Sequence, residues 1–425
     1  MQHPFIDTNP PAPKAAGSRW LSTFAALRYP HFRTLWITTG LVAGGVWFQQ
    51  VTLGWLAYDL TKDPLQVGII LGVRSAPLLL APLTGTLADR LDRRKMLLVD
   101  QSFVAALVLG FSVVLFLGVQ QVWHLYVFAA LFGMLWSINN PVRQTLVATS
   151  VPREALMNGV ALNSLAFNSM RAIGPALGGV LLVFFGPAVN FLLQGIAFAG
   201  VLILLVRLSP GAGSEDRQTA RDQSIAKGLA SGFTYVFSHP TTLTTTAVSF
   251  VLTLTTLSVV FNQLPVYTAE VLLDTEGGLL GLLLMAMGVG GVLGTLVMAR
   301  FARFRHKGLQ VIFAFSGAAL SLVVLSQVSS VPVAMAILVL QQAFTQVVMT
   351  SNLTIVQMGT PDEMRGRVTG VYQMEIGMMP IGGVIAGAIA SLYGVTVAFM
   401  LGGTIGLISV AAIALFVPSF RRLKL

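Results

Sequence analysis

Apolar stretches of about 20 residues recur along this chain, from residue 34 to residue 417, with short polar turns between them. A helix needs about 20 apolar residues to cross the hydrocarbon core of a bilayer. We therefore predict an all-α membrane protein with twelve transmembrane helices in two six-helix bundles. The first bundle is expected to have its spans at 34–58, 66–88, 96–118, 122–147, 157–184 and 188–207. The second is expected to have them at 241–268, 277–300, 308–328, 331–357, 367–392 and 395–417.

Polar segments divide the chain into parts. The long polar segment at 209–227 contains proline, glycine and charged residues, as linkers do, and it separates the two groups of spans. An amphipathic stretch near 225–237 is expected to lie on the membrane surface. The predicted parts are a cytoplasmic tail (1–30), a first six-helix bundle (31–207), a cytoplasmic linker with the amphipathic segment (208–238), a second six-helix bundle (239–418) and a cytoplasmic tail (419–425).

The composition argues against several classes of protein. The chain is 55% hydrophobic and 10% charged, with a mean hydropathy of +0.79, whereas soluble domains carry about 25% charged residues. The absence of cysteine excludes disulfides and thiolate metal sites. The five histidines lie in the tail or at span ends, and neither a Gly-x-x-x-x-Gly-Lys-Ser/Thr loop nor a nucleophile–base cluster occurs. We expect no metal, no cofactor and no enzymatic activity.

The basic residues cluster on one side of the predicted spans. The isoelectric point near 10.3 could suggest nucleic acid as a partner, but the lysines and arginines occupy short loops between spans. With a cytoplasmic N-terminus, 23 of the 26 fall on the cytoplasmic side, and this count includes Arg143 and Arg153 near the connection between the fourth and fifth spans. The bias predicts a multi-pass protein of the bacterial inner membrane with both termini cytoplasmic.

The sequences of the two halves are related by an internal repeat. A shift of 209 residues brings 85–87 onto 294–296, both Gly-Thr-Leu, and Gly174 onto Gly383. The same shift matches Pro152 with Pro361, Glu154 with Glu363 and Gly178 with Gly387. One common offset at separated places indicates two parallel halves, which is typical of secondary transporters with a site between the repeats.

The turn between the second and third spans carries a dense cluster of charge. Residues 85–95 read Gly-Thr-Leu-Ala-Asp-Arg-Leu-Asp-Arg-Arg-Lys, which must form a short turn at the membrane surface because such charges cannot remain in hydrocarbon. The turn resembles the signature Gly-x-Leu-Ala-Asp-Arg-x-Gly-Arg-Arg/Lys of the major facilitator superfamily, with Asp92 in place of the second glycine. The candidate gate residues that match are Gly85, Asp89, Arg90, Arg93 and Arg94.

The resemblance implies that Asp89 and the arginines lock the two halves in the outward-open state. The alternative is a basic cluster that only sets topology, although that role does not require the glycine and the aspartate. The faded copy at 294–305 has Met298 where the first half has Asp89. We therefore expect the latch on one side of the pseudo-two-fold axis only.

A second motif lies in the fifth span. Residues 171–179 read Arg-Ala-Ile-Gly-Pro-Ala-Leu-Gly-Gly and resemble the Gly-Pro motif of drug–proton antiporters. The segments 361–367 and 140–143 resemble the subgroup that holds enterobactin exporters and macrolide efflux proteins. The alternative reading is a helix bend with close packing, since proline breaks a helix bond and a Gly-x-x-x-Gly face lets helices approach. The residues concerned are Gly174, Pro175, Gly178 and Gly179.

Few charged residues lie inside the predicted spans. A charge at the bilayer centre costs about 2.5–3.5 kcal/mol on insertion scales, so Arg74, Arg171 and Glu375 are expected to face the interior. Each is a candidate for substrate binding or proton coupling, or for a structural ion pair. Glu375 is the candidate for coupling, because a buried carboxyl can exchange a proton. Asp100 is a weaker candidate that we expect to pair with loop arginines.

Amide side chains mark a candidate cavity lining. They serve equally well as hydrogen-bonding partners between helices, so both readings stay open. The amides concerned are Gln49, Gln50, Asn163, Asn168, Asn262, Gln263, Gln341 and Gln373.

These features predict a secondary active exporter that works by alternating access, with proton antiport. The expected substrate is a hydrophobic or amphipathic small molecule, a drug such as a macrolide or a siderophore, and the expected assembly is a monomer. The alternative is a lipid or lysophospholipid flippase of the same fold without proton coupling.

Overall fold

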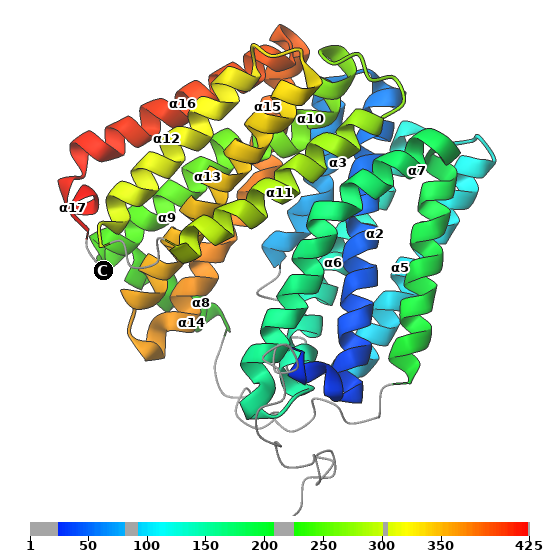
Figure 1. Cartoon of the computed structure of the whole chain (residues 1–425), viewed down its shortest axis with the longest axis horizontal. Coiled ribbons are helices and arrows are strands. Elements are labelled where there is room, and N and C mark those ends of the chain that lie inside the picture. Colours follow the sequence, from blue (N-terminus) through cyan, green and yellow to red (C-terminus); the bar gives the residue numbers. More distant parts are fainter. Residues whose placement is uncertain (1–23, 81–91, 208–224, 301–304, 424–425) are drawn as a thin grey trace, which may run out of the picture.

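The computed structural model describes residues 24–80, 92–207, 225–300 and 305–423. Every regular element in these residues is a helix, so the predicted all-α class is confirmed. Figure 1 shows two groups of helices side by side, one from the first half of the chain and one from the second.

The first half begins with a short 3₁₀ turn and continues in long helices. Its elements are η1 (Ala25–Arg28), α2 (Pro30–Thr61), α3 (Pro64–Ser75), η2 (Ala76–Leu80), α5 (Arg93–Phe116), α6 (Val122–Thr149), η3 (Arg153–Ala155) and α7 (Leu156–Val206).

The second half starts with α8, which covers the stretch expected to be amphipathic. Its elements are α8 (Ile225–Ser238), α9 (Pro240–Leu252), the π-helical turn η4 (Thr253–Leu257), α10 (Ser258–Glu270), α11 (Gly278–Arg300), α12 (Lys307–Leu325), α13 (Val331–Met358), α14 (Asp362–Gln373), η5 (Met374–Met378), α15 (Met379–Tyr393), α16 (Val395–Phe416) and α17 (Pro418–Arg421).

The 51 residues of α7 contain two spans that reverse at Gly186. This glycine has φ 75° and ψ 174°, a conformation that side chains with a Cβ rarely adopt. Asn190 Nδ2 donates a hydrogen bond to the carbonyl of Gly178 at 2.8 Å. In a straight helix these residues would lie about 18 Å apart, so the chain must turn back between them.

Nine helical stretches of the described residues are long and apolar enough to cross a membrane. One is α7 with its two spans; another runs continuously from α9 to α10, and a third from α14 to α15. Together with α2 and α3, they correspond to the twelve predicted spans. We call the end of the molecule where α2 begins the near face, and the end where α2 and α10 stop the far face.

Acidic side chains cap the starts of two helices in the first half. Asp63 accepts a hydrogen bond from the backbone N–H of Leu65 at 2.9 Å at the start of α3. Asp92 accepts one from the N–H of Lys95 at 3.1 Å at the start of α5. Such caps satisfy N–H groups that have no partner within the helix. The acid that replaces the second glycine of the signature thus has a local structural role.

The two halves meet along two glycine-rich seams, α7 against α11 and α3 against α15. A methyl group on Gly281 of α11 would lie 2.6 Å from the carbonyl oxygen of Pro175, so the backbones are in contact there. In the other seam, Gly72 faces Pro380 and Val384. The shift of 209 residues relates Gly72 to Gly281 and position 175 to 384. The contacts between the halves therefore follow the internal repeat.

Candidate substrate cavity

A cavity of about 340 Å³ lies inside the first half, between α2, α6 and α7. Trp136 and Phe167 contribute aromatic surface to its wall, and Val147 and Val160 contribute aliphatic surface. Its polar lining includes Asn139, Asn140, Arg143, Gln144, Asn163 and Asn168. The lining is mixed apolar and polar, as small-molecule sites usually are. Asn163 and Asn168 are the two predicted cavity amides that line it.

A buried chain of hydrogen bonds crosses the wall of this cavity. Asp100 of α5 accepts from Asn139 Nδ2 at 2.5 Å, and the oxygen of the same amide accepts from Arg143 Nε at 3.2 Å. Arg143 Nη1 then donates to Thr38 Oγ1 of α2 at 2.9 Å. Asp100 and Arg143 are 4% and 5% exposed. Asn139 therefore links two buried opposite charges, which compensate each other.

Arg143, which the count of basic residues places near the connection between the fourth and fifth spans, lies within the fourth span. Arg143 belongs to α6, which continues through Pro141 to Thr149. Proline removes one hydrogen bond from a helix, and here the helix continues because it is packed on both sides. The sequence contained an indication of this arrangement, because Asn139 and Arg143 are four residues apart and so lie on one face of a helix. Asp100 is linked to Arg143 through Asn139, and Arg143 lies inside a span rather than in a loop.

Two further arginines reach the middle of α2. Arg74 of α3 donates to Gln49 Oε1 at 3.2 Å and to Gln50 Oε1 at 2.7 Å, and its guanidinium carbon lies 5.5 Å from the ring centre of Phe132. The guanidinium of Arg171 lies 5.9 Å from the ring centre of Trp47. Both arginines are half-buried.

Glu375 lies in the second half, on the 3₁₀ turn η5 between α14 and α15, and is 3% exposed. It interacts with the side chains of Ser249 and Tyr372, whose hydroxyl oxygens lie 3.2 Å apart. Asn352 Nδ2 donates to the same serine at 2.7 Å. Glu375 Oε2 has no hydrogen-bond partner, and no lysine or arginine of the described residues forms an ion pair with Glu375. The carboxyl group is thus buried among neutral polar groups.

The remaining predicted amides, all in the second half, are not part of the cavity wall. Asn262 donates to the carbonyl of Ser258 in its own helix, at 2.8 Å, and Gln341 donates to Thr345 at 3.2 Å. Gln263 reaches the carbonyl of Pro64 in the first half at 3.5 Å, and so it lies at the contact between the halves. Gln373 is exposed at the end of α14.

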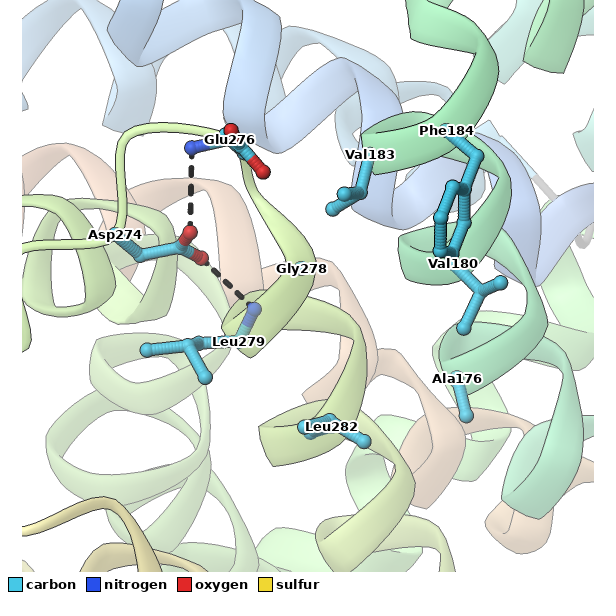
Figure 2. Close-up of a pocket in the computed structure, with 9 residues that line it drawn as sticks. All are labelled: Ala176, Val180, Val183, Phe184, Asp274, Glu276, Gly278, Leu279 and Leu282. Atoms are coloured by element: carbon cyan, nitrogen blue, oxygen red, sulfur yellow. Dashed lines mark hydrogen bonds between the residues drawn. The ribbon is translucent and has the colours of Figure 1, made fainter.

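On the far face, α7 and the start of α11 line an open pocket of about 320 Å³ (Figure 2). Asp274 accepts hydrogen bonds from the N–H groups of Glu276, Gly277 and Leu279 at 3.2, 3.0 and 2.8 Å, which fixes the turn before α11. Figure 2 shows apolar side chains facing this turn from α7, among them Val180 and Val183. Beside this region the hydroxyl of Tyr58 in α2 donates to Glu270 Oε1 in α10 at 2.9 Å, a direct bond between the halves.

The helix-bend residues of α7 face two neighbouring helices, α2 and α11. A methyl group on Gly174 would lie 2.9 Å from Trp47 Cβ, and one on Gly178 would lie 3.0 Å from Phe48 Cα. Gly179 faces Gly281, as Pro175 does. The motif therefore lets α7 approach both α2 and α11 closely.

The predicted gate residues are only partly within the described part of the chain. Gly85, Asp89 and Arg90 lie outside it. Arg93 is the first residue of α5, and Arg94 Nη2 donates to the carbonyl of Val206 at the end of α7, at 2.8 Å. Among the described residues, no three His, Asp or Glu side chains converge as metal ligands would.

Comparisons with known proteins cover almost the whole chain. Residues 21–423 match the family model described as transmembrane secretion effector. The staphyloferrin A transporter of Staphylococcus aureus is 25% identical over 90% of this chain and 94% of that protein. The multidrug efflux pump Tap of Mycolicibacterium fortuitum is 26% identical over 88% and 92%. The enterobactin exporter EntS of Escherichia coli O1:K1 is 23% identical over 89% and 92%.

Solved structures show the same fold. The nucleoside transporter NupG superposes with a TM-score of 0.71 at 13% identity, over 91% of this chain and 99% of that one. The resemblance to the major facilitator superfamily, and within it to enterobactin exporters and drug efflux proteins, is thereby confirmed.

Proposed function

This chain belongs to the transmembrane secretion effector family of the major facilitator superfamily, a multi-pass membrane transporter rather than an enzyme, and we propose that it exports a small organic molecule by alternating access. The names of the relatives support efflux. The observation that carries the proposal is the pairing of a cavity within the first half with a far face where the halves are tied together. Tyr58 and Glu270 form that tie, together with the seam at Gly281.

The near face is assigned to the cytoplasm of a bacterium. The clustering of basic residues at that side of the spans supports this orientation, and the relatives are bacterial proteins. The transporter is proposed to act as a monomer in the inner membrane, taking its substrate from the cytoplasm into the cavity between α2, α6 and α7. Drugs such as macrolides and siderophores are the proposed substrate classes.

Proton antiport is proposed to depend on Glu375. Its carboxyl group is buried, has a free oxygen and lies beside hydroxyl groups rather than a cation. An unneutralised charge is costly inside a membrane, so binding and release of a proton there would bias the equilibrium between two conformations.

The export proposal is tested with a deletion strain and a complemented strain. We expect the deletion to increase sensitivity to a macrolide such as erythromycin or to reduce the iron chelators secreted into the medium. The complemented strain should restore the lost property. If neither property changes in the deletion strain, both proposed substrate classes are excluded.

A flippase for lipids or lysophospholipids is the second candidate, and the apolar far-face pocket favours it. Val180, Val183 and Leu282 would suit an acyl chain that enters between the halves. The two functions differ in their dependence on a proton gradient. Lysophospholipid movement in proteoliposomes that continues after the gradient is collapsed would support the flippase, and its absence would support the exporter.

A further inference from the structure

Two arginines converge on one turn of α2 in the middle of the first half. Arg74 contacts Gln49 and Gln50, and Arg171 lies against Trp47. Successive helix residues rise by about 1.5 Å, so positions 47–50 span about 5 Å along α2. Each guanidinium comes from a different helix, α3 or α7, and the two therefore approach this turn from different neighbours.

Neither of these two charges is neutralised within the described part of the chain. Among the described residues, no carboxylate lies within 4.0 Å of Arg74 or Arg171. The partners of Arg74 are two neutral amide oxygens, and that of Arg171 is the face of an indole ring. Arg143 in the same half differs, because Asn139 links it to Asp100. Unneutralised cations at the depth of the membrane interior mark sites that bind an opposite charge.

The free polar atoms at this turn are hydrogen-bond donors. Guanidinium groups and indole N–H groups donate and do not accept. Trp47 Nε1 and Gln49 Nε2 are buried without a partner, while the oxygens of Gln49 and Gln50 already accept from Arg74. A group of donors without a free acceptor is complementary to an anion such as a carboxylate.

The turn also adjoins the cavity. Asn168 lines the cavity and precedes Arg171 by three residues, and Ala43 lines it and precedes Trp47 by four. Residues three or four apart are neighbours on one helix face, so Arg171 and Trp47 continue the faces of α7 and α2 that line the cavity. Phe167 adds apolar wall at the same level.

We propose that Arg74, Arg171 and Trp47 form an anion-binding subsite, and that the transported molecule is an organic anion with an apolar body. This inference rests on the proposed export function and assigns its substrate class. The anionic group is held at the turn 47–50, and the apolar part occupies the cavity between α2, α6 and α7.

Binding of three matched probes tests the subsite. Biphenyl-4-carboxylate, the neutral biphenyl-4-carboxamide and the cationic biphenyl-4-methanamine share one body and differ in charge. Their dissociation constants are measured by calorimetry on the purified full chain in lipid nanodiscs. We expect the carboxylate to bind about tenfold more tightly than the carboxamide, because hydrogen bonds to a charged group are the stronger ones. The amine should bind more weakly than both.

Variants assign this preference to the two arginines. Arg74→Gln and Arg171→Gln should each weaken carboxylate binding about tenfold and leave carboxamide binding unchanged, since one charge-assisted contact is lost. Arg74→Lys and Arg171→Lys should retain part of the preference, and they keep the test valid if a glutamine variant fails to fold. Arg421→Gln, an exposed arginine of α17, is the control. Equal affinity for carboxylate and carboxamide, no saturable carboxylate binding, or unchanged binding in both glutamine variants overturns the subsite.

Transport of the same probes separates this inference from the export proposal. If the carboxylate binds through the arginines but vesicles containing the protein do not move it or any proposed substrate, the export function fails and the subsite stands. If vesicles export the carboxylate and both glutamine variants export it as well as the wild type does, the subsite is wrong and export stands.

Discussion

Charged side chains inside the first half differ in their partners. One pair has compensating charges, and two arginines do not. Asp100 and Arg143 compensate each other through Asn139, whereas the partners of Arg74 and Arg171 in the described part of the chain are neutral. The compensated pair joins α2, α5 and α6 through hydrogen bonds. An uncompensated cation gains most from a ligand that supplies the missing charge.

At Glu375 we expect the glutamine variant to lose proton coupling. Glu375→Gln keeps the size and hydrogen-bonding capacity of the side chain but cannot exchange a proton. Substrate-induced proton flux in proteoliposomes should fall to the background, while substrate binding persists. Glu363→Gln, on the exposed side of α14, is the matched control and should retain full flux. Undiminished flux in Glu375→Gln would remove Glu375 from the coupling mechanism.

At Asp100 we expect a loss of stability. Asp100→Asn leaves Arg143 buried with its charge uncompensated, and breaking a buried pair in this way costs about 3 kcal/mol or more. The midpoint of thermal unfolding in detergent should fall. The double variant Asp100→Asn/Arg143→Met should recover most of the loss, because it removes both charges. A double variant less stable than the single one would contradict this account.

At the scale of the helix, the α7–α11 seam depends on Gly281. In Gly281→Ala the new methyl group would lie 2.6 Å from the carbonyl oxygen of Pro175, so the helices must separate. Overpacking of this kind typically costs about 1–3 kcal/mol. We expect a lower unfolding midpoint, measured as above. Gly40→Ala in α2 is the control, because nothing lies within 4 Å of its added methyl group. Equal unfolding midpoints in both variants would show that the α7–α11 contact accommodates the added methyl group without loss of stability.

How far the sequence predicts these elements depends on the range of the interaction. Apolar runs gave span positions that agree with the helices within a few residues, because burial in a bilayer acts on each stretch separately. The continuation of α6 through Pro141 was predicted as well, because the apolar run 122–147 extends across the proline. Other contacts join residues that are distant in sequence. Asp100 is linked to Arg143 in this way, and Arg74 and Arg171 both contact α2. No local pattern contains such information.

At the scale of the whole molecule, the bond between Tyr58 and Glu270 joins the two halves at the far face. Tyr58→Phe removes this one hydrogen bond between the halves. Because the bond is exposed, it contributes about 1 kcal/mol, so the far-open population should rise about fivefold. The chain has no cysteine, so a single Leu182→Cys substitution on the buried side of the far-face contact reports opening. We expect faster labelling by a membrane-impermeant maleimide when Tyr58→Phe is added.

The control for this measurement is Tyr393→Phe, an exposed tyrosine at the end of α15. It should leave the labelling rate unchanged. If Tyr58→Phe also leaves the rate unchanged, the far face is held by the seams alone.

The proposed latch at the near face acts in the opposite state. We expect Asp89→Asn to reduce export while the protein reaches the membrane in normal amount, which immunoblotting of membranes and uptake assays measure together. Asp92→Asn is the comparison, since an asparagine still caps α5 and transport should be retained. Full export in Asp89→Asn would leave the charged turn with topology as its only role.

The two seams also record what a duplicated half must keep and what it is free to lose. Gly68 and Gly277 occupy equivalent places, and an added methyl group would lie 2.5 Å from the carbonyl oxygen of Gly383 at one and 2.5 Å from Trp55 Cδ1 at the other. Met298, the counterpart of Asp89, is instead a buried apolar residue. Contacts that both halves need for the same steric reason have survived divergence, whereas the charge that one half alone could supply has been replaced. The close glycine contact is therefore present in both halves, whereas the acidic residue is present only in the first.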